Sequence, residues 1–573
     1  MKVGLSFRQK SLPALVLAIL LVFAATSAMA KPWKFGVMGD TQWTCPTDPK
    51  ANDPNTVSTS IIEQVNPQFI NAGVKFVIQV GDLTDNGSDS GIAARATAAK
   101  PLMDAGIGFF PMRGNHETYG SPPNDYAIPA FRDNFPQTQS GGFKKSDGKK
   151  FNVGSNFNSP TPVSADLKGM SYSFDFGRPG NSARFVIIDN WVTPSKKVAA
   201  AGYNYGYSIG DQQPWISSRL DTKTRRTEHV FVLSHQPLMA EDHQDSPFTG
   251  YTNANPEMQN AFFAALKGDN VGYYLSGHDH MHQRSLIASP DGASSVHELI
   301  CASESSKFYS PKPLDDANWF GQKVRETSIA QERARVGYYI FTVDGPRVSA
   351  DYYADTAGDW QSDASYPRGP SGSGSQVTPL LNFTKRESWG YSLNGKEILV
   401  AQGGSYALSD DTSRAITRGE KGYILTTARI LGGTNDSTMT DGSLITSGGS
   451  TYRHLTKAVD TGWSPGAANG PAIASDVLTL WGMSDVGSSQ SDTYVLSMSY
   501  DKAVRSQRIS GLVSRDASGR WVNAVDRNTG GTKGFVSGPW DSCYGLGTYG
   551  VDPATHTAWA IINHTGDFAV GRE

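Results

Sequence analysis

Short apolar runs, rich in β-branched and aromatic residues, recur along the first half of the chain, and polar residues follow each run at once. Runs of this length and composition are typical of buried strands. We expect strands at 34–38, 75–80, 108–112, 230–233 and 271–275. Helical spacing over 58–72 and 92–105 separates the first three runs, and strands that alternate with helices indicate βαβ units. The first half is therefore predicted to be an α/β domain in which helices flank the sheets.

The pattern changes after residue 280, where strands and turns replace the alternation with helices. We expect further strands at 296–301, 336–343 and 348–353. Residues 366–375 are mostly Pro, Gly and Ser, a composition typical of a linker. Beyond them, short alternating segments between turn residues predict a β-sandwich or a related all-β module. The predicted parts are a first domain at 31–365, a linker at 366–379 and a β-rich accessory domain at 380–573.

The first thirty residues differ from the rest of the chain. Lys2, Arg8 and Lys10 give a basic start, residues 12–25 are apolar, and Ala28-Met29-Ala30 is a small-x-small cleavage pattern. The apolar stretch is too short to span a membrane comfortably, so a cleaved secretory signal is favoured over an anchor. We therefore expect a secreted or periplasmic protein with no transmembrane anchor once residues 1–30 are removed.

Charge and cysteine content limit the possible partners and the redox chemistry. The chain has 51 Lys and Arg against 54 Asp and Glu, and loss of the predicted signal makes it more acidic. No basic surface for nucleic acid is evident, since binding without sequence preference needs one. The cysteines are Cys45, Cys301 and Cys543. Export would permit a Cys45–Cys301 disulfide, and three free or buried thiols are the alternative.

The polar residues that follow the five predicted strands have the character of metal ligands. In an open α/β sheet, groups at the carboxyl ends of the strands collect at one edge. Oxygen and imidazole donors together suit Zn, Mn or Fe better than Ca or Mg, and Asp82 on its tight Gly81 turn is suited to bridge two ions. The motifs are Gly39-Asp40-Thr41-Gln42, Gly81-Asp82, Gly114-Asn115-His116-Glu117, Ser234-His235 and Gly277-His278-Asp279-His280.

In this order the motifs resemble those of the calcineurin-like metallophosphoesterases, a family that includes the purple acid phosphatases. The resemblance covers 35–284 and implies an αββα sandwich with two divalent or trivalent ions of Mn, Zn or Fe. It also implies that His116 lies outside the ligand set and faces the substrate. The implied ligands are Asp40, Asp82 and His280 for the first ion and Asp82, Asn115, His235 and His278 for the second.

Two positions depart from the family pattern. Gln42 stands where many members have His, and because an amide oxygen is a weaker ligand than imidazole, we expect Gln42 to bind the metal loosely or through water. Asp85 stands where purple acid phosphatases have a Tyr, which argues against a tyrosinate–iron(III) centre. A generic dinuclear phosphoesterase fits these residues better than a purple enzyme.

The predicted activity is hydrolysis of a small phosphate ester, either a monoester or a diester, by a metal-activated hydroxide. We expect His116 to act as the acid and Asn115 and His116 to contact the substrate. Arg113 is a candidate for a phosphate contact, and a structural ion pair is its alternative. The other readings are a 5′-nucleotidase or cyclic-nucleotide phosphodiesterase, and a non-catalytic surface-binding protein with a retained metal site. The β-rich domain is expected to contact a glycan or a cell surface, or to pack on the first domain.

Overall fold

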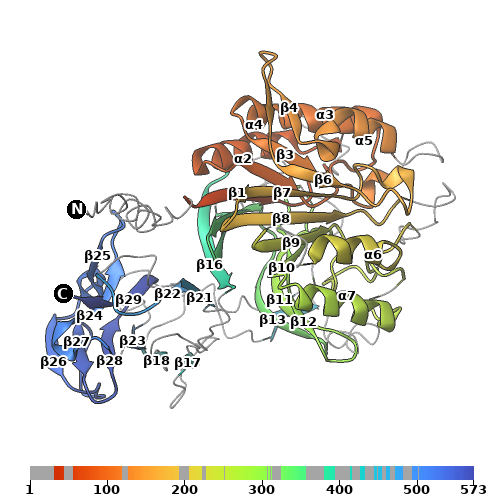
Figure 1. The fold of residues 1–573 in the computed structure, drawn as a ribbon. Helices are drawn as coiled ribbons and strands as arrows, with labels where there is room; N and C mark the ends of the chain where they lie inside the picture. The colour runs from red at the N-terminus through yellow and green to blue at the C-terminus, as the bar shows by residue number, and fades with distance from the viewer. Residues whose placement is uncertain are drawn as a thin grey trace, which may run out of the picture.

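The computed structural model describes residues 31–43, 56–118, 127–192, 206–221, 227–250, 252–305, 307–309, 311–312, 324–356, 380–393, 413–415, 426–432, 444–447, 450–453, 460–464, 472–481, 493–500 and 503–573. The first domain is built from two sheets that lie face to face, with helices on the outer face of each (Figure 1). This arrangement confirms the predicted αββα sandwich. Cys45 and the predicted signal and linker lie outside the described residues, in which Cys301 and Cys543 are free.

The first sheet has six strands in the order β16-β15-β14-β1-β2-β3. Strands β1, β2 and β3 are parallel, and β14, β15 and β16 add to them in antiparallel fashion. The carboxyl ends of three parallel strands therefore meet at one edge. The bounds are β1 (Trp33–Met38), β2 (Phe76–Gln79), β3 (Gly108–Pro111), β14 (Gly337–Asp344), β15 (Arg347–Asp355) and β16 (Phe383–Ser392).

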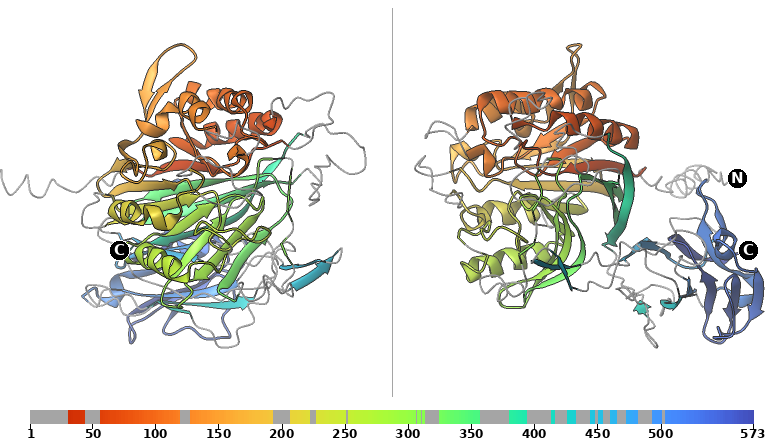
Figure 2. Two further views of the ribbon diagram at one scale, coloured as in Figure 1. Left: turned by 90° about the vertical axis from the view of Figure 1, so that its right-hand side faces the viewer. Right: turned by 180° about the vertical axis from the view of Figure 1, so that it is seen from behind.

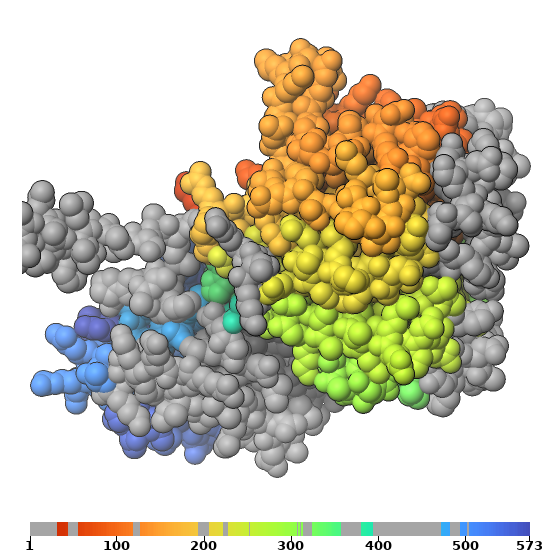
Figure 3. Space-filling view, turned by 45° about the vertical axis from the view of Figure 1, so that its right-hand side comes forward, coloured from red at the N-terminus to blue at the C-terminus, as the bar shows by residue number. Residues whose placement is uncertain are grey.

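The second sheet has eight strands in the order β13-β11-β12-β10-β9-β8-β7-β6. Its central strands β12, β10, β9 and β8 are parallel, so this sheet also gathers carboxyl ends at one edge. The bounds are β6 (Ser155–Asn158), β7 (Tyr172–Arg178), β8 (Asn181–Ile188), β9 (His229–Ser234), β10 (Tyr273–Ser276), β11 (His282–Ala288), β12 (Ser295–Ile300) and β13 (Glu326–Glu332). A small hairpin, β4 (Gly142–Lys144) and β5 (Lys150–Asn152), projects from the body of the domain (orange, Figure 3).

Aromatic side chains fill the space between the two sheets. Phe35 of β1 stacks on Phe341 of β14 with ring centroids 4.9 Å apart, and its edge meets Phe185 and Phe231 of the second sheet at 5.0 Å. All four rings are fully buried, and burial of each contributes about 1.5–3 kcal/mol. This ring packing holds the two sheets against each other and so sets the relative position of their carboxyl edges.

Helices cover the outer faces because their apolar residues recur at helical spacing. In α2 the buried residues Ile61, Ile62, Val65 and Phe69 form one stripe against the first sheet, and the helix ends at Gly73 with φ 70. Helix α6 begins with a capping box in which Ser208 and Asp211 satisfy each other's backbone N–H. The helices are α2 (Thr59–Ala72), α3 (Asp89–Ala98), α4 (Lys100–Asp104) and α5 (Ile128–Asn134) on the first sheet and α6 (Ile209–Leu220) and α7 (Pro256–Gly268) on the second.

The last part of the chain is built of strands, as predicted, and these lie together at the lower side of the molecule in both views of Figure 2 (blue). Its main sheets have the orders β17-β18-β23-β28-β27-β26 and β21-β22-β29-β24-β25, and nearly all pairs are antiparallel. The bounds are β17 (Ser413–Ala415), β18 (Thr426–Gly432), β19 (Leu444–Ser447), β20 (Ser450–Arg453), β21 (Asp460–Ser464), β22 (Val477–Trp481), β23 (Thr493–Ser499), β24 (Ile509–Arg515), β25 (Trp521–Asn523), β26 (Gly534–Ser537), β27 (Thr548–Asp552), β28 (Thr557–Ile562) and β29 (Gly566–Arg572).

Strand β16 lies near the start of the range 380–573 that was predicted as the accessory domain. Strand β16 pairs along its whole length with β15, so residues 383–392 belong to the first sheet. From there β16 runs towards the C-terminal strands (Figure 1), and Arg347 of β15 forms an ion pair with Asp567 of β29 at 2.8 Å. The C-terminal module thus packs on the edge strands of the first domain. No helix among the described residues is long and apolar enough to cross a membrane.

Candidate metal centre

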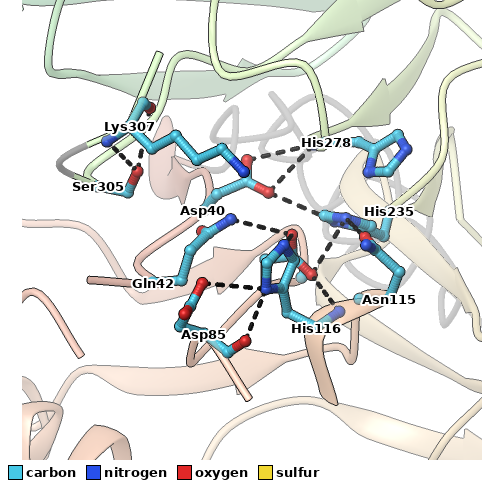
Figure 4. Close-up of polar contacts among 12 residues, drawn as sticks. Asp40, Gln42, Asp85, Asn115, His116, His235, His278, Ser305 and Lys307 are labelled. Carbon is cyan, nitrogen blue, oxygen red and sulfur yellow. Dashed lines mark hydrogen bonds and ion pairs between the residues drawn. The ribbon is translucent and has the colours of Figure 1, made fainter. Parts of the chain in front are cut away.

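The five polar motifs meet where the carboxyl edges of the two sheets face each other (Figure 4). Asp40, Asp82 and Asn115 follow β1, β2 and β3, while the histidines follow β9 and β10 of the other sheet. All six predicted ligands other than Gln42 are at least 93% buried, and Gln42 is fully buried beside them. The structure therefore brings together every residue that the sequence predicted as a ligand: Asp40, Gln42, Asp82, Asn115, His235, His278 and His280.

The backbone at this edge is tight. Asp82, His278 and His280 have φ values of 44, 76 and 49, in the left-handed backbone region that residues other than glycine rarely adopt. A Cβ on Gly81 would lie 2.3 Å from Nδ1 of His235, and one on Gly114 would lie 2.0 Å from Oδ1 of Asp82. Glycine before Asp82 and before Asn115 is therefore needed for the close approach of the neighbouring ligand.

Two groups of three ligands share one carboxylate. The donor atoms of Asp82, His235 and His278 lie within 4.8 Å of one another, and those of Asp40, Asp82 and His280 form a second set of the same size. Because Asp82 belongs to both sets, it is placed to bridge two ions. This is the arrangement expected of a two-metal hydrolytic site.

The hydrogen bonds of the histidines leave one nitrogen of each ring available as a ligand. Nδ1 of His235 donates to Val80 O at 2.8 Å, and Nδ1 of His280 donates to Lys307 O at 2.7 Å. Nε2 of His278 lies 3.1 Å from Oδ1 of Asp245. Since an imidazole that donates from one nitrogen has its lone pair on the other, these partners select the tautomers that bind metal.

The electrostatics of the site favour a cation. Burial, opposed by His235 and reinforced by Asp82, raises the pKa of Asp40 to about 7. Burial alone would lower the pKa of His235, but Asp82 and Asp40 raise it to about 10. Burial alone would raise the pKa of Asp82, yet His235 and His116 hold it well below its ordinary value. Two buried carboxylates this close repel each other, and bound cations relieve that repulsion.

Asn115 and Gln42 complete the ligand set with amides. Oδ1 of Asn115 lies 3.1 Å from Nε2 of His235, in the second group of ligands. Nε2 of Gln42 lies 3.2 Å from Oδ2 of Asp82 and 3.0 Å from Nε2 of His280, while its buried Oε1 has no hydrogen-bond partner. Exchange of the two amide ends would turn Oε1 towards the ligands of the first group. The donor set therefore fits two metal ions, with Gln42 at the first of them.

His116 lies at the edge of the ligand set and is 13% exposed in its side chain. Its backbone N–H donates to Oδ1 of Asp82 at 3.0 Å, and its Nδ1 lies 2.8 Å from Asp85 O and 3.3 Å from Asp85 Oδ1. Burial alone would lower the pKa of His116, but Asp82 and Asp85 raise it to about 9. The ring is thus held through Nδ1 by residue 85, which leaves Nε2 on the side of Asp82.

Arg113 and His282 lie next to the motifs in sequence but serve the fold. The guanidinium of Arg113 is fully buried and forms a two-point ion pair with Asp189, at 2.8 and 3.0 Å. This buried pair with Asp189 is the structural ion pair expected as the alternative to a phosphate contact. His282 is fully buried, and its Nε2 lies 2.8 Å from Glu387 of β16.

Sequence reasoning missed the residues that support the ligands from other loops. Asp279, the variable residue of the Gly277–His280 motif, accepts hydrogen bonds from the backbone N–H groups of residues 241–243 and from His243. Asp245 holds His278, and Tyr309 packs its ring edge-on against His280 at 4.8 Å. Only Asp279 carried a signal, because it lies inside a motif.

Comparisons with known proteins give one matching family model and several similar solved structures. Residues 34–282 match the family model described as calcineurin-like phosphoesterase. Similar solved structures include a dimetal phosphatase from Danio rerio (15% identity, 56% of this chain and 95% of that one, TM-score 0.35), PhoD (12%, 64% and 70%, 0.39) and the purple acid phosphatase PPD1 from yellow lupin, Lupinus luteus (12%, 56% and 51%, 0.37). No curated protein sequence matches the chain.

Proposed function

Because residues 34–282 form a calcineurin-like metallophosphoesterase domain, we propose that the protein is an exported hydrolase of small phosphate esters that works with two metal ions. The observation that carries this proposal is the sharing of Asp82 by two buried groups of ligands, with His116 held at their edge by residue 85. Mn, Zn and Fe are the candidate metals because the donors are carboxylate, amide and imidazole. Asp85 forms part of the support of His116, and a tyrosinate–iron(III) centre is not expected.

The protein's own residues divide the work of such a reaction. When bound, a pair of metal ions supplies a water of lowered pKa and offsets charge on the phosphoryl oxygens. Asp40, Gln42, Asp82 and His280 would hold one ion, and Asp82, Asn115, His235 and His278 the other.

The acid of the reaction is His116. Asp85 occupies its Nδ1, so the proton on Nε2 is the one free to move to the leaving oxygen. Asn115, at the adjacent position, is expected to contact the same phosphate. A non-catalytic metal site has no need of an acid positioned in this way, which favours an enzyme over a surface-binding protein.

Metal analysis of the purified mature protein, combined with a substrate panel, tests the proposal. The panel contains p-nitrophenyl phosphate, its bis ester and several nucleotides, and Asp82→Asn provides the inactive control. We expect two metal ions per chain and hydrolysis of at least one ester. Selectivity for nucleotides would assign the nucleotidase or phosphodiesterase alternative, and two ions without hydrolysis of any ester would favour the binding protein.

Export is supported by the basic start, apolar stretch and cleavage pattern of residues 1–30. N-terminal sequencing of protein recovered from outside the cytoplasm should begin at Lys31. An intact Met1 terminus in the cytoplasmic fraction would contradict export.

A further inference from the structure

Lys307 is a cationic residue at the metal centre that none of the motifs contains. It lies in the segment that follows β12, at the same edge as the ligands, and Figure 4 shows its side chain running from beside Ser305 towards Asp40 and His278. Its backbone is fixed, because Lys307 O accepts from Nδ1 of His280 at 2.7 Å and from Oγ of Ser305 at 3.1 Å. The backbone of Lys307, from which the side chain extends, is therefore fixed relative to the predicted ligand His280.

The surroundings of the ammonium group are aromatic. Nζ lies 4.7 Å from the ring centroid of Tyr309, and that ring in turn meets His280 at 4.8 Å and His243 at 4.7 Å. The charge thus lies on the side of the centre away from His116 (Figure 4).

The ammonium has no carboxylate partner among the described residues. Lys312, a few residues further on, provides a contrast, since its Nζ pairs with Asp242 at 2.9 Å. A cation–π contact at a partly exposed site shifts the population of a side chain by only about fivefold, so the ammonium is free to move to a stronger partner. A compact ammonium on a flexible stem is a phosphate-binding group.

We propose that Lys307 is a substrate-binding residue whose ammonium contacts a phosphoryl oxygen of the bound phosphate group. This inference rests on the proposed function for the nature of the substrate. In the bound state His116 and Lys307 would approach the phosphate from two sides of the metal centre, so that the anion is enclosed by positive charge.

Binding of inorganic phosphate to the metal-loaded full-length mature protein tests the role of Lys307. Lys307→Met keeps an apolar stem over Tyr309 and removes the charge, Lys307→Arg keeps the charge, and Lys312→Met removes a lysine that already has a partner. We expect Lys307→Met to weaken phosphate binding by about 10- to 100-fold, since a charge-assisted hydrogen bond is lost. Lys307→Arg should restore most of the affinity, and Lys312→Met should leave it unchanged.

Metal content and thermal unfolding of each variant separate a phosphate contact from a structural role. Unchanged phosphate affinity in Lys307→Met at full metal content would overturn the inference. Loss of metal or of the folded state in both Lys307→Met and Lys307→Arg would also overturn it, because the residue would then act through the fold. With ester substrates, we expect Lys307→Met to raise KM more than it lowers kcat.

The phosphate measurement needs no turnover, so it is independent of the ester panel. A protein that binds phosphate through Lys307 and hydrolyses no ester would contradict the proposed function and support the role of Lys307. If the protein hydrolyses an ester and Lys307→Met keeps its full affinity for phosphate, the proposed function would be supported and the role of Lys307 contradicted.

Discussion

At the scale of single residues, the site is held by pairs in which an outer residue fixes an inner one. Asp85 holds His116 through its backbone oxygen and its carboxylate, and Asp245 holds His278 through its carboxylate alone. Removal of an outer residue should therefore weaken the function of the inner residue without abolishing that function. The proposed function divides the inner residues into two classes, the metal ligands and the acid His116, and different measurements distinguish these classes.

His116→Asn should lose activity and keep its metal. The acid of the reaction is removed while every ligand remains, so kcat should fall by about 10²–10⁴-fold. Metal analysis and steady-state kinetics on the best substrate of the panel measure the two effects. Asp85→Asn is the matched control, since the backbone oxygen of residue 85 still holds Nδ1 and the loss should be smaller. Full activity of His116→Asn would refute the assigned acid role.

Asp82→Asn should lose both metal ions together, because Asp82 belongs to both groups of ligands. The protein without metal should also be less stable than the loaded protein. Metal at about a hundred times its Kd adds about 2.7 kcal/mol to the free energy of unfolding, and chelation should lower the Tm by several degrees. Thermal unfolding with and without chelator measures this shift. An equal Tm in both conditions would show that the site holds no metal.

At the scale of secondary-structure elements, β16 joins the two sheets through one carboxylate. Glu387 on this strand is buried and pairs with Arg284 of β11 at 2.6 Å and with His282 of β11 at 2.8 Å. Arg284 also lies over the ring of Trp389 on β16, at 4.9 Å. An edge strand of the first sheet is thus tied to the second sheet next to the segment that carries His278 and His280.

Glu387→Ala should destabilise the first domain by about 3–5 kcal/mol, since it removes the carboxylate that neutralises the buried Arg284. Chemical denaturation measures this loss. Lys385→Ala on the same strand is the control, because its side chain is 53% exposed and its Nζ lies 3.7 Å from Asp351. Its loss should be below about 1 kcal/mol. A Glu387→Ala protein as stable as the control would show that the pair contributes nothing.

The carboxylate of Glu387 also makes the free energy of unfolding depend on pH. Burial alone would raise the pKa of Glu387, but Arg284 and His282 lower it from 4.5 to about 2. A carboxylate with a lowered pKa in the folded protein stabilises the fold at pH values above its ordinary pKa of 4.5. This contribution of about 3 kcal/mol is lost as the pH falls from 4.5 towards 2. Unfolding free energies between pH 6 and pH 2 should therefore decrease less steeply in Glu387→Gln than in the unaltered protein.

Much of the site was predictable because its residues are local. Asp82 and His280 stand directly after apolar runs, so the chain itself marks them as strand-end residues. Lys307 and Tyr309 lie in a segment with no such mark, and their place beside His280 arises only when β12 pairs with β10. The membership of β16 in the first sheet was equally hidden, because register against β15 is a property of the folded sheet and not of composition.

At the scale of the whole molecule, a polar contact links the two parts of the chain. Arg347 of β15 pairs with Asp344 of its own sheet and with Asp567 of β29 at 2.8 Å, and it is 14% exposed. A double-mutant cycle with Arg347→Met and Asp567→Asn should give a coupling free energy of about 1 kcal/mol, measured by denaturation of the full chain. Additive effects of the two substitutions would show that the contact does not hold the parts together.

The pairing of β16 with β15 also determines which elements the Pro-, Gly- and Ser-rich segment connects. Residues 357–379 connect two neighbouring antiparallel strands of one sheet, so their ends are held close together by the ladder itself. The entropy of closing such a connection grows only with the logarithm of its length, and a doubling costs about 0.6 kcal/mol. The segment is thus a permissive site for insertion within one domain, where added chain leaves the distance between the two parts of the molecule unchanged.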